Sequence, residues 1–280
     1  LIVFLYILIV YPIVGSWQWG GGFLSTLTDE VGFYDFAGST LVHSVGGWGG
    51  LVIIYLLGAR KGKFDSSGKA LAIPGSNIPL SAAGVLILWL GWFGFNGGSV
   101  LSADPANTSL VLVTTCLAAA AGGLGATFLS TLMYKNLDIT MFMNGVLGGL
   151  VGITAGADQM GPTSAIIIGA IGGAVVVLGV ALLDKCKLDD PVGAIPVHLF
   201  AGIWGTLAVG LFGASAGFDQ FMVQLASVGI VGVFCVIGAA IIALIVKSIM
   251  GLRVSDEEEE IGLDISEHGT KAYFLSLIHI

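Results

Sequence analysis

The segment DFAGSTLVHSVGGWGG, residues 35–50, places a carboxylate and a histidine in a stretch that is otherwise apolar. The 280-residue chain around it is 56% hydrophobic and 10% charged, and its mean hydropathy is +0.98. A composition this apolar is typical of integral membrane proteins rather than of soluble domains. The segment therefore raises the question of why a membrane helix would carry two ionisable groups.

Apolar runs, most of them long enough to cross a bilayer, recur along the chain. We expect eight crossings, at residues 1–14, 36–57, 78–95, 110–134, 139–157, 163–183, 192–212 and 221–249. The runs lack the alternation of barrel strands, so each must satisfy its own backbone as a helix. Glycines four apart, such as Gly145 and Gly149, indicate close helix packing. The sequence predicts an all-α, polytopic membrane helix bundle.

The cationic residues are confined to alternate loops and to the tail, whereas the other loops carry only acidic side chains. The ten cations are Arg60, Lys61, Lys63, Lys69, Lys135, Lys185, Lys187, Lys247, Arg253 and Lys271. The positive-inside rule then places these loops and the C-terminal tail in the cytoplasm of a multi-pass cell-membrane protein. The net charge of -8 does not favour nucleic acid as a partner.

A short motif occurs twice, as DFAGSTLVH at residues 35–43 and as DPVGAIPVH at residues 190–198. Both copies fit D-x-x-G-x-x-x-V-H, and the expected topology has them enter the membrane from opposite sides, as in inverted repeats. At 1.5 Å per residue, His43 and His198 lie about 12 Å along their helices, at similar depth. Ionisable residues at that depth indicate a shared functional site. The two aspartates are expected to cap their helices.

The stretch WLGWFGFNGGS ends the third run. We interpret Trp89 and Trp92 as anchors at the membrane surface. Phe95 and Ser99 lie four residues apart, on one helix face, and at the level of Trp19. Aromatic faces beside a hydroxyl would attract a small cation, by about 1–2 kcal/mol when partly desolvated.

The tail RVSDEEEEIGLDISEHGTKAY is acidic and is expected to be solvated. Its residues Asp264, Glu267 and His268 lie in a segment that is not of low complexity, and we expect them to dock against another surface. We divide the chain into a membrane domain at residues 1–250, a cytoplasmic regulatory tail at 251–274, and LSLIHI at 275–280, which we interpret as a sequencing artefact. A start without methionine inside an apolar run suggests an N-terminal truncation.

Several segments, in order, resemble the ammonium transporters, the Amt branch of the Amt/Mep/Rh family. They are DFAGSTLVHSVGGWGGLVIIYLLGAR, WFGFNGGS, MNGVLGGLVGITAGAD, DDPVGAIPVH and GLDISEHG. The resemblance implies an eleven-helix inverted-repeat fold, here without its first three helices. It also implies a homotrimer with a pore in each subunit, and a transporter rather than an enzyme, with no cofactor and no metal.

The resemblance also suggests roles for individual residues. His43 and His198 correspond to twin pore histidines, Trp19 and Ser99 to outer cation-recruitment residues near Asp35, and Phe95 to the inner member of a phenylalanine gate. Ammonium would lose its proton at the outer mouth and cross as ammonia. The tail would meet a PII-type regulatory protein.

Two other function classes remain. Some members of the family resemble a transporter but act as ammonium sensors, which signal through the C-terminal tail. The two histidines could alternatively be axial haem ligands of a redox enzyme. Haem propionates would ordinarily require more polar groups than these segments offer.

Overall fold

The computed structural model describes residues 1–28 and 31–272. Eight helical rods follow one another in this part of the chain: Ile2–Ser16 (α1, η1 and α2), Ser39–Leu57 (η3 and α3), α4 (Ile78–Gly98), α5 (Pro105–Tyr134), α6 (Ile139–Ile153), α7 (Pro162–Lys185), Pro196–Phe212 (η4 and α8) and α9 (Phe218–Met250). Two of these rods begin with π-helical turns, η3 (Ser39–Ser44) and η4 (Pro196–Phe200). Short helices η2 (Phe23–Thr26), α10 (Asp256–Ile261) and α11 (Leu263–Ser266) complete the helical elements.

The eight rods match the eight predicted crossings, and five of them are long and apolar enough to span a membrane. Their boundaries differ from the prediction where polar residues cap a helix. The second and seventh rods begin later than predicted, at Ser39 and Pro196, because the aspartate loops precede them. The fifth rod ends earlier, at Ile153, where the chain leaves the helix inside the bundle. Residues 275–280, which we interpreted as an artefact, and the end of the predicted tail lie outside the described residues.

Glycines bring α5, α6 and α7 into backbone contact. A Cβ at Gly149 would overlap the carbonyl oxygen of Ala118, and one at Gly173 would overlap that of Gly122. Such close approach is how helices associate in lipid, where apolar burial alone gives little preference for protein over lipid. The predicted packing role of Gly145 and Gly149 is thus confirmed.

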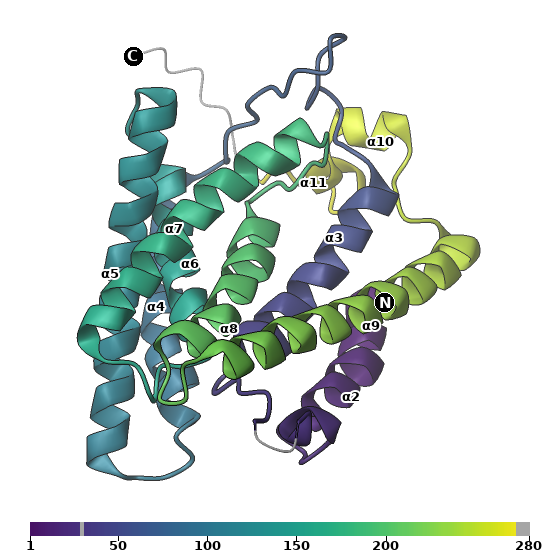
Figure 1. The fold of residues 1–280 in the computed structure, drawn as a ribbon. Coiled ribbons are helices and arrows are strands. Elements are labelled where there is room, and N and C mark those ends of the chain that lie inside the picture. The colour runs from purple at the N-terminus through teal and green to yellow at the C-terminus, as the bar shows by residue number, and fades with distance from the viewer. Residues whose placement is uncertain (29–30, 273–280) are drawn as a thin grey trace.

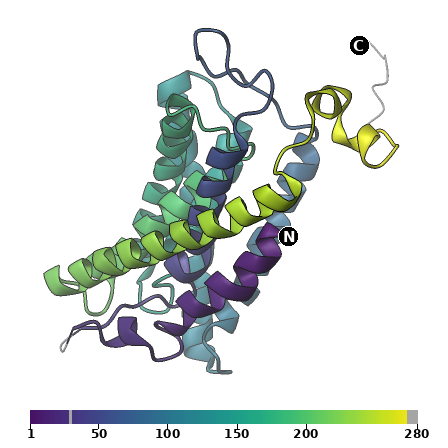
Figure 2. The same cartoon turned by 90° about the vertical axis from the view of Figure 1, so that its right-hand side faces the viewer.

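The cationic loops gather at one end of the bundle, which we call the inner end. The connection from α3 to α4 and the helices α10 and α11 lie together at this end (Figures 1 and 2). Here the Arg60 guanidinium forms a bidentate ion pair with Asp189: its Nε donates to Oδ2 at 2.7 Å and its Nη2 to Oδ1 at 2.9 Å. Hydrogen bonding to Arg60 holds the pKa of the Asp189 carboxyl below its usual range.

The first part of the tail folds back onto the inner end. Arg253 donates both to the carbonyl oxygens of Leu57 and Ala59 and to the Glu259 carboxylate. Glu259 in turn accepts the backbone N–H of Lys61 at 2.9 Å. The acidic run predicted as solvated therefore has one docked face, held by charged hydrogen bonds to the end of α3.

The second part of the tail folds on itself. The Asp264 carboxylate accepts the N–H groups of Ile265 and Ala272, which closes a loop around residues 264–272. Glu267 and His268 are exposed. The three residues predicted to dock therefore divide into one that shapes the tail and two that face solvent.

Candidate functional site

Asp35 is fully buried and caps the rod that carries His43. Its two carboxylate oxygens accept four backbone N–H groups at 2.8–2.9 Å, from Gly38, Ser39, Thr40 and Leu41. These are the orphan donors at the start of a helix, and a carboxylate satisfies them while it meets the positive end of the helix dipole. The predicted capping role is confirmed, and these four bonds are all the hydrogen bonds that the Asp35 carboxylate makes in the described chain.

The second copy of the motif repeats this arrangement. Asp190 accepts the N–H groups of Val192, Gly193 and Ile195 at 2.7–3.3 Å. Gly38 and Gly193, the glycines of D-x-x-G, have φ angles of 114° and 76°. Glycine tolerates this left-handed turn, which lets the chain double back over the aspartate. The motif therefore encodes a specific helix start in both halves.

The two histidines meet in the middle of the bundle. Their Nδ1 atoms lie 3.2 Å apart, and the rings stack with centroids 5.2 Å apart and an interplanar angle of 15°. Each belongs to a π-helical turn; the N–H of His43, for example, reaches the carbonyl of Gly38, five residues back. The extra residue in such a turn changes where the side chain points, and π turns occur often at functional sites.

Two aromatic side chains of α4 flank His43. The Trp92 indole stacks on the imidazole at 5.0 Å and 12°, and the Phe95 ring is tilted against it at 5.7 Å. Trp92 is only 7% exposed, so its interpretation as a surface anchor was wrong. The sequence did hold a signal, because Trp92 lies three residues before Phe95 and seven before Ser99, on the same helix face.

An apolar cavity of about 310 Å³ opens beside the histidine pair. It is lined by Val42, His43, Gly46, Gly47, Gly50, Ala194, Ile195 and His198. Gly46 and Gly50 follow His43 along α3 toward the inner end, so the cavity lies on the inner side of the pair. The Nε2 atom of His43 is buried and has no hydrogen-bond partner in the described chain. A small polar molecule could satisfy it, since a buried lone polar atom is costly.

The predicted recruitment residues lie nearer the end of the bundle opposite the cationic loops, which we call the outer end. The Trp19 indole N–H donates to the Asp35 carbonyl at 2.8 Å, and Trp19 as a whole is 44% exposed. The Ser99 hydroxyl donates to the Phe95 carbonyl at 2.9 Å. Trp19 is thus tied to the segment that caps the His43 helix, and Ser99 to the aromatic pair beside His43.

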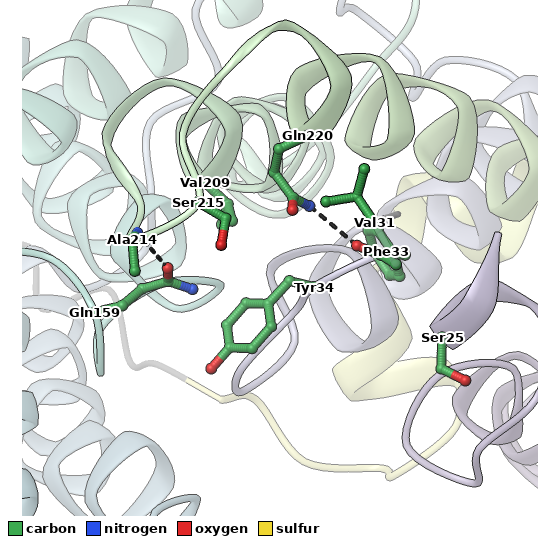
Figure 3. Close-up of a pocket in the computed structure, with 10 residues that line it drawn as sticks. Ser25, Val31, Phe33, Tyr34, Gln159, Val209, Ala214, Ser215 and Gln220 are labelled. Atoms are coloured by element: carbon green, nitrogen blue, oxygen red, sulfur yellow. Dashed lines mark hydrogen bonds between the residues drawn. The ribbon is translucent and has the colours of Figure 1, made fainter. Parts of the chain in front are cut away.

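A different cavity, of about 480 Å³, also opens at the outer end (Figure 3). It is bordered by Tyr34, Gln159 and Gln220, with Gln220 donating to the Gly32 carbonyl. Trp19 and Ser99 are not among the described residues that line it, and none of those described residues carries a carboxylate or an amine. Because the predicted recruitment residues Trp19 and Ser99 do not line this cavity, we do not assign ammonium recruitment to it.

Comparison with known proteins gives a consistent result. The model of the Ammonium Transporter Family matches residues 1–273. Ammonium transporter Amt2 of Archaeoglobus fulgidus is 43% identical over 95% of this chain and 62% of its own length. The ammonium transporter of Bacillus subtilis is 37% identical over 95% of this chain and 66% of its own.

Solved structures agree with this. A structure described as a Sensor Amt Protein superposes with a TM-score of 0.87 at 36% identity, covering 92% of this chain and 67% of that one. Mep2 of Candida albicans gives 0.82 at 28% identity, over 92% and 60%. The chain spans about half to two thirds of the length of the curated relatives it matches. From its fold, its helix starts and these matches, this multi-pass membrane protein belongs to the ammonium transporter family.

Proposed function

We propose that this protein carries ammonium nitrogen across a cell membrane, with neutral ammonia passing the His43–His198 pair. The observation that carries the proposal is the 3.2 Å contact between two imidazoles in an apolar interior, beside a cavity that fits small molecules. Relatives named ammonium transporters support the substrate.

The physical argument is a comparison of charges. An isolated ion in a low-dielectric interior loses far more solvation free energy than a neutral molecule of the same size. Ammonia needs only a few hydrogen bonds, and imidazole nitrogens can donate or accept them. Deprotonating ammonium outside the apolar passage is therefore the route of lower free energy, and the proton is left behind or passed along the histidines.

The outer residues would act before that step. The exposed indole of Trp19 and the hydroxyl of Ser99 would hold the ammonium ion, by cation–π and hydrogen-bond contact. Phe95, in contact with His43, would close the passage to hydrated ions. The Asp35 carboxylate, already bonded to four N–H groups, would favour the cation through its charge and would hold the mouth in shape.

The test is ammonium-evoked current and methylammonium uptake in proteoliposomes. Replacing His43 and His198 with alanine should abolish the selective uptake of the neutral species. Tyr55→Ala serves as a control, because Tyr55 lies on the same helix and is 74% exposed, away from the histidine pair. Uptake that is unchanged in the double variant would remove the histidines from the mechanism.

An ammonium sensor is the second candidate, because one similar structure is described as a Sensor Amt Protein. In that role ammonium would bind at the same site and change the tail contact between Arg253 and Glu259. A sensor would show ammonium-dependent proteolysis of the tail without net uptake. A transporter would show uptake whether or not the tail responds.

We also propose a homotrimer with a cytoplasmic tail that meets a PII-type protein. The exposed Glu267 and His268 would be part of that contact, beside the loop that Asp264 closes. Native mass spectrometry tests the trimer, and a pull-down compares the chain with one lacking residues 264–272. Equal capture of the regulatory protein by both chains would exclude the tail.

A further inference from the structure

The indole of Trp92 has one buried hydrogen-bond partner. Its Nε1–H donates to the Oγ1 of Thr154 at 3.0 Å, and both residues are buried. A buried indole N–H left without an acceptor is costly, so this bond fixes how the ring rotates about its side-chain bonds. The orientation matters because the same ring stacks on His43.

A short hydrogen bond to the backbone holds the Thr154 hydroxyl in its accepting role toward Trp92. A hydroxyl has a single proton, and the 2.7 Å contact to the Leu150 carbonyl takes it. The lone pairs of Oγ1 then face Trp92. The Asn96 Oδ1 atom, a second and more distant acceptor for that proton, lies 3.4 Å from Oγ1. The Asn96 amide donates to the Thr115 hydroxyl at 3.0 Å, which closes a fully buried polar cluster between α4, α5 and the end of α6.

The backbone beside Thr154 holds the other side of the histidine site. The carbonyls of Thr154 and Ala155 accept the N–H groups of Ala37 and Phe36, at 3.1 and 2.9 Å. The N–H of Ala155 donates to the hydroxyl of Ser39, at 2.7 Å. These contacts are possible because α6 stops at Ile153, inside the bundle, and frees backbone groups there.

We propose that Thr154 is a positioning residue for the histidine pair. Its side chain fixes the indole that stacks on His43, and its backbone fixes the segment from which the His43 helix starts. The inference rests on the proposed function and deepens it: an indole fixed against His43 would limit the space beside the pair, and so the discrimination between ammonium and methylammonium. Asn96 and Thr115 support the arrangement by closing the polar cluster.

The first test does not require transport. The protein labelled with 5-fluorotryptophan has six indole signals in its ¹⁹F NMR spectrum, and Trp92→Phe identifies one of them. Thr154→Val keeps the shape of the side chain but removes the acceptor, and it should shift or broaden the Trp92 signal alone. Thr154→Ser, which restores the hydroxyl, should return it. An unmoved Trp92 signal in Thr154→Val overturns the proposal.

The second test measures selectivity. Thr154→Val should raise the ratio of methylammonium to ammonium uptake by about tenfold, the usual discrimination for one methylene group in a tight site. A merely structural defect would lower both rates by the same factor and leave the ratio unchanged, and that result overturns the positioning role. Thr114→Val is the control, because its hydroxyl is equally buried but donates to backbone carbonyls only.

The two tests separate this inference from the proposed function. If the wild-type protein carries no ammonium, the proposed function fails, while the NMR experiment still decides whether Thr154 orients Trp92. If uptake is present and the NMR signal does not move, the positioning inference alone fails.

Discussion

Replacing Asp35 with asparagine should lower the folding stability of the protein, whether or not Asp35 takes part in transport. Each carboxylate oxygen of Asp35 accepts two N–H groups, from Gly38 and Ser39 on one and from Thr40 and Leu41 on the other. An asparagine side chain keeps one acceptor and turns an NH₂ group toward two N–H donors. A buried orphan N–H costs about 1–3 kcal/mol, so the two cost about 2–6 kcal/mol.

The assay is thermal unfolding of the purified protein in detergent, followed by size-exclusion chromatography. The matched variant is Asp190→Asn, which should cost less because Asp190 accepts three N–H groups and is only partly buried. A proton-accepting role for Asp35 predicts something else, namely a folded protein that has lost transport. An Asp35→Asn protein that unfolds at the wild-type temperature would refute the capping argument.

Two further predictions concern packing and pH. Gly173→Ala should destabilise the bundle by about 1–3 kcal/mol, because the new Cβ would overlap the Gly122 backbone, whereas Gly229→Ala meets open space; unfolding temperatures compare the two. The Arg60–Asp189 pair lowers the pKa of Asp189, so its contribution is present above the unfolded-state pKa of about 3.9 and is lost as pH falls through the lower folded-state value. Asp189→Asn should therefore lose more stability at pH 7 than at pH 3, and an equal loss at both pH values would contradict the ion-pair explanation.

The sequence was sufficient for the helices and for the meeting of the two histidines. Apolar run length predicts the rods, because a lipid-facing backbone must satisfy itself. The repeated D-x-x-G-x-x-x-V-H predicts two equivalent helix starts, and the equal spacing from aspartate to histidine brings His43 and His198 to one depth. The repeated motif and the opposite directions of the two helices therefore both predict the contact between His43 and His198.

The sequence was not sufficient for the wall of the site. A tryptophan near the end of an apolar run, such as Trp92, is typical of an anchor at the membrane surface. Its burial depends on how α4 lies against α6, which no local sequence pattern specifies. The role of Thr154 depends on where α6 ends, at Ile153, directly before Thr154. The Thr154 hydroxyl still donates to the carbonyl of Leu150 in the last turn of that helix. The predicted run continued to residue 157, because the residues that follow are as apolar and small as those within the helix.

The contact between the two Nδ1 atoms limits the positive charge that the two imidazole rings can hold. A hydrogen bond at 3.2 Å requires one Nδ1 to donate and the other to accept, so the neutral pair has one ring protonated at Nδ1 and the other at Nε2. Protonating both rings would place two N–H groups against each other in an apolar interior, which breaks the contact and adds an unscreened repulsion. The pair can therefore hold at most one extra proton. In the neutral pair the two Nε2 atoms differ, because one can accept a hydrogen bond and the other can donate one. Such a pair suits a neutral molecule that both donates and accepts hydrogen bonds, as ammonia does, better than it suits a bare cation.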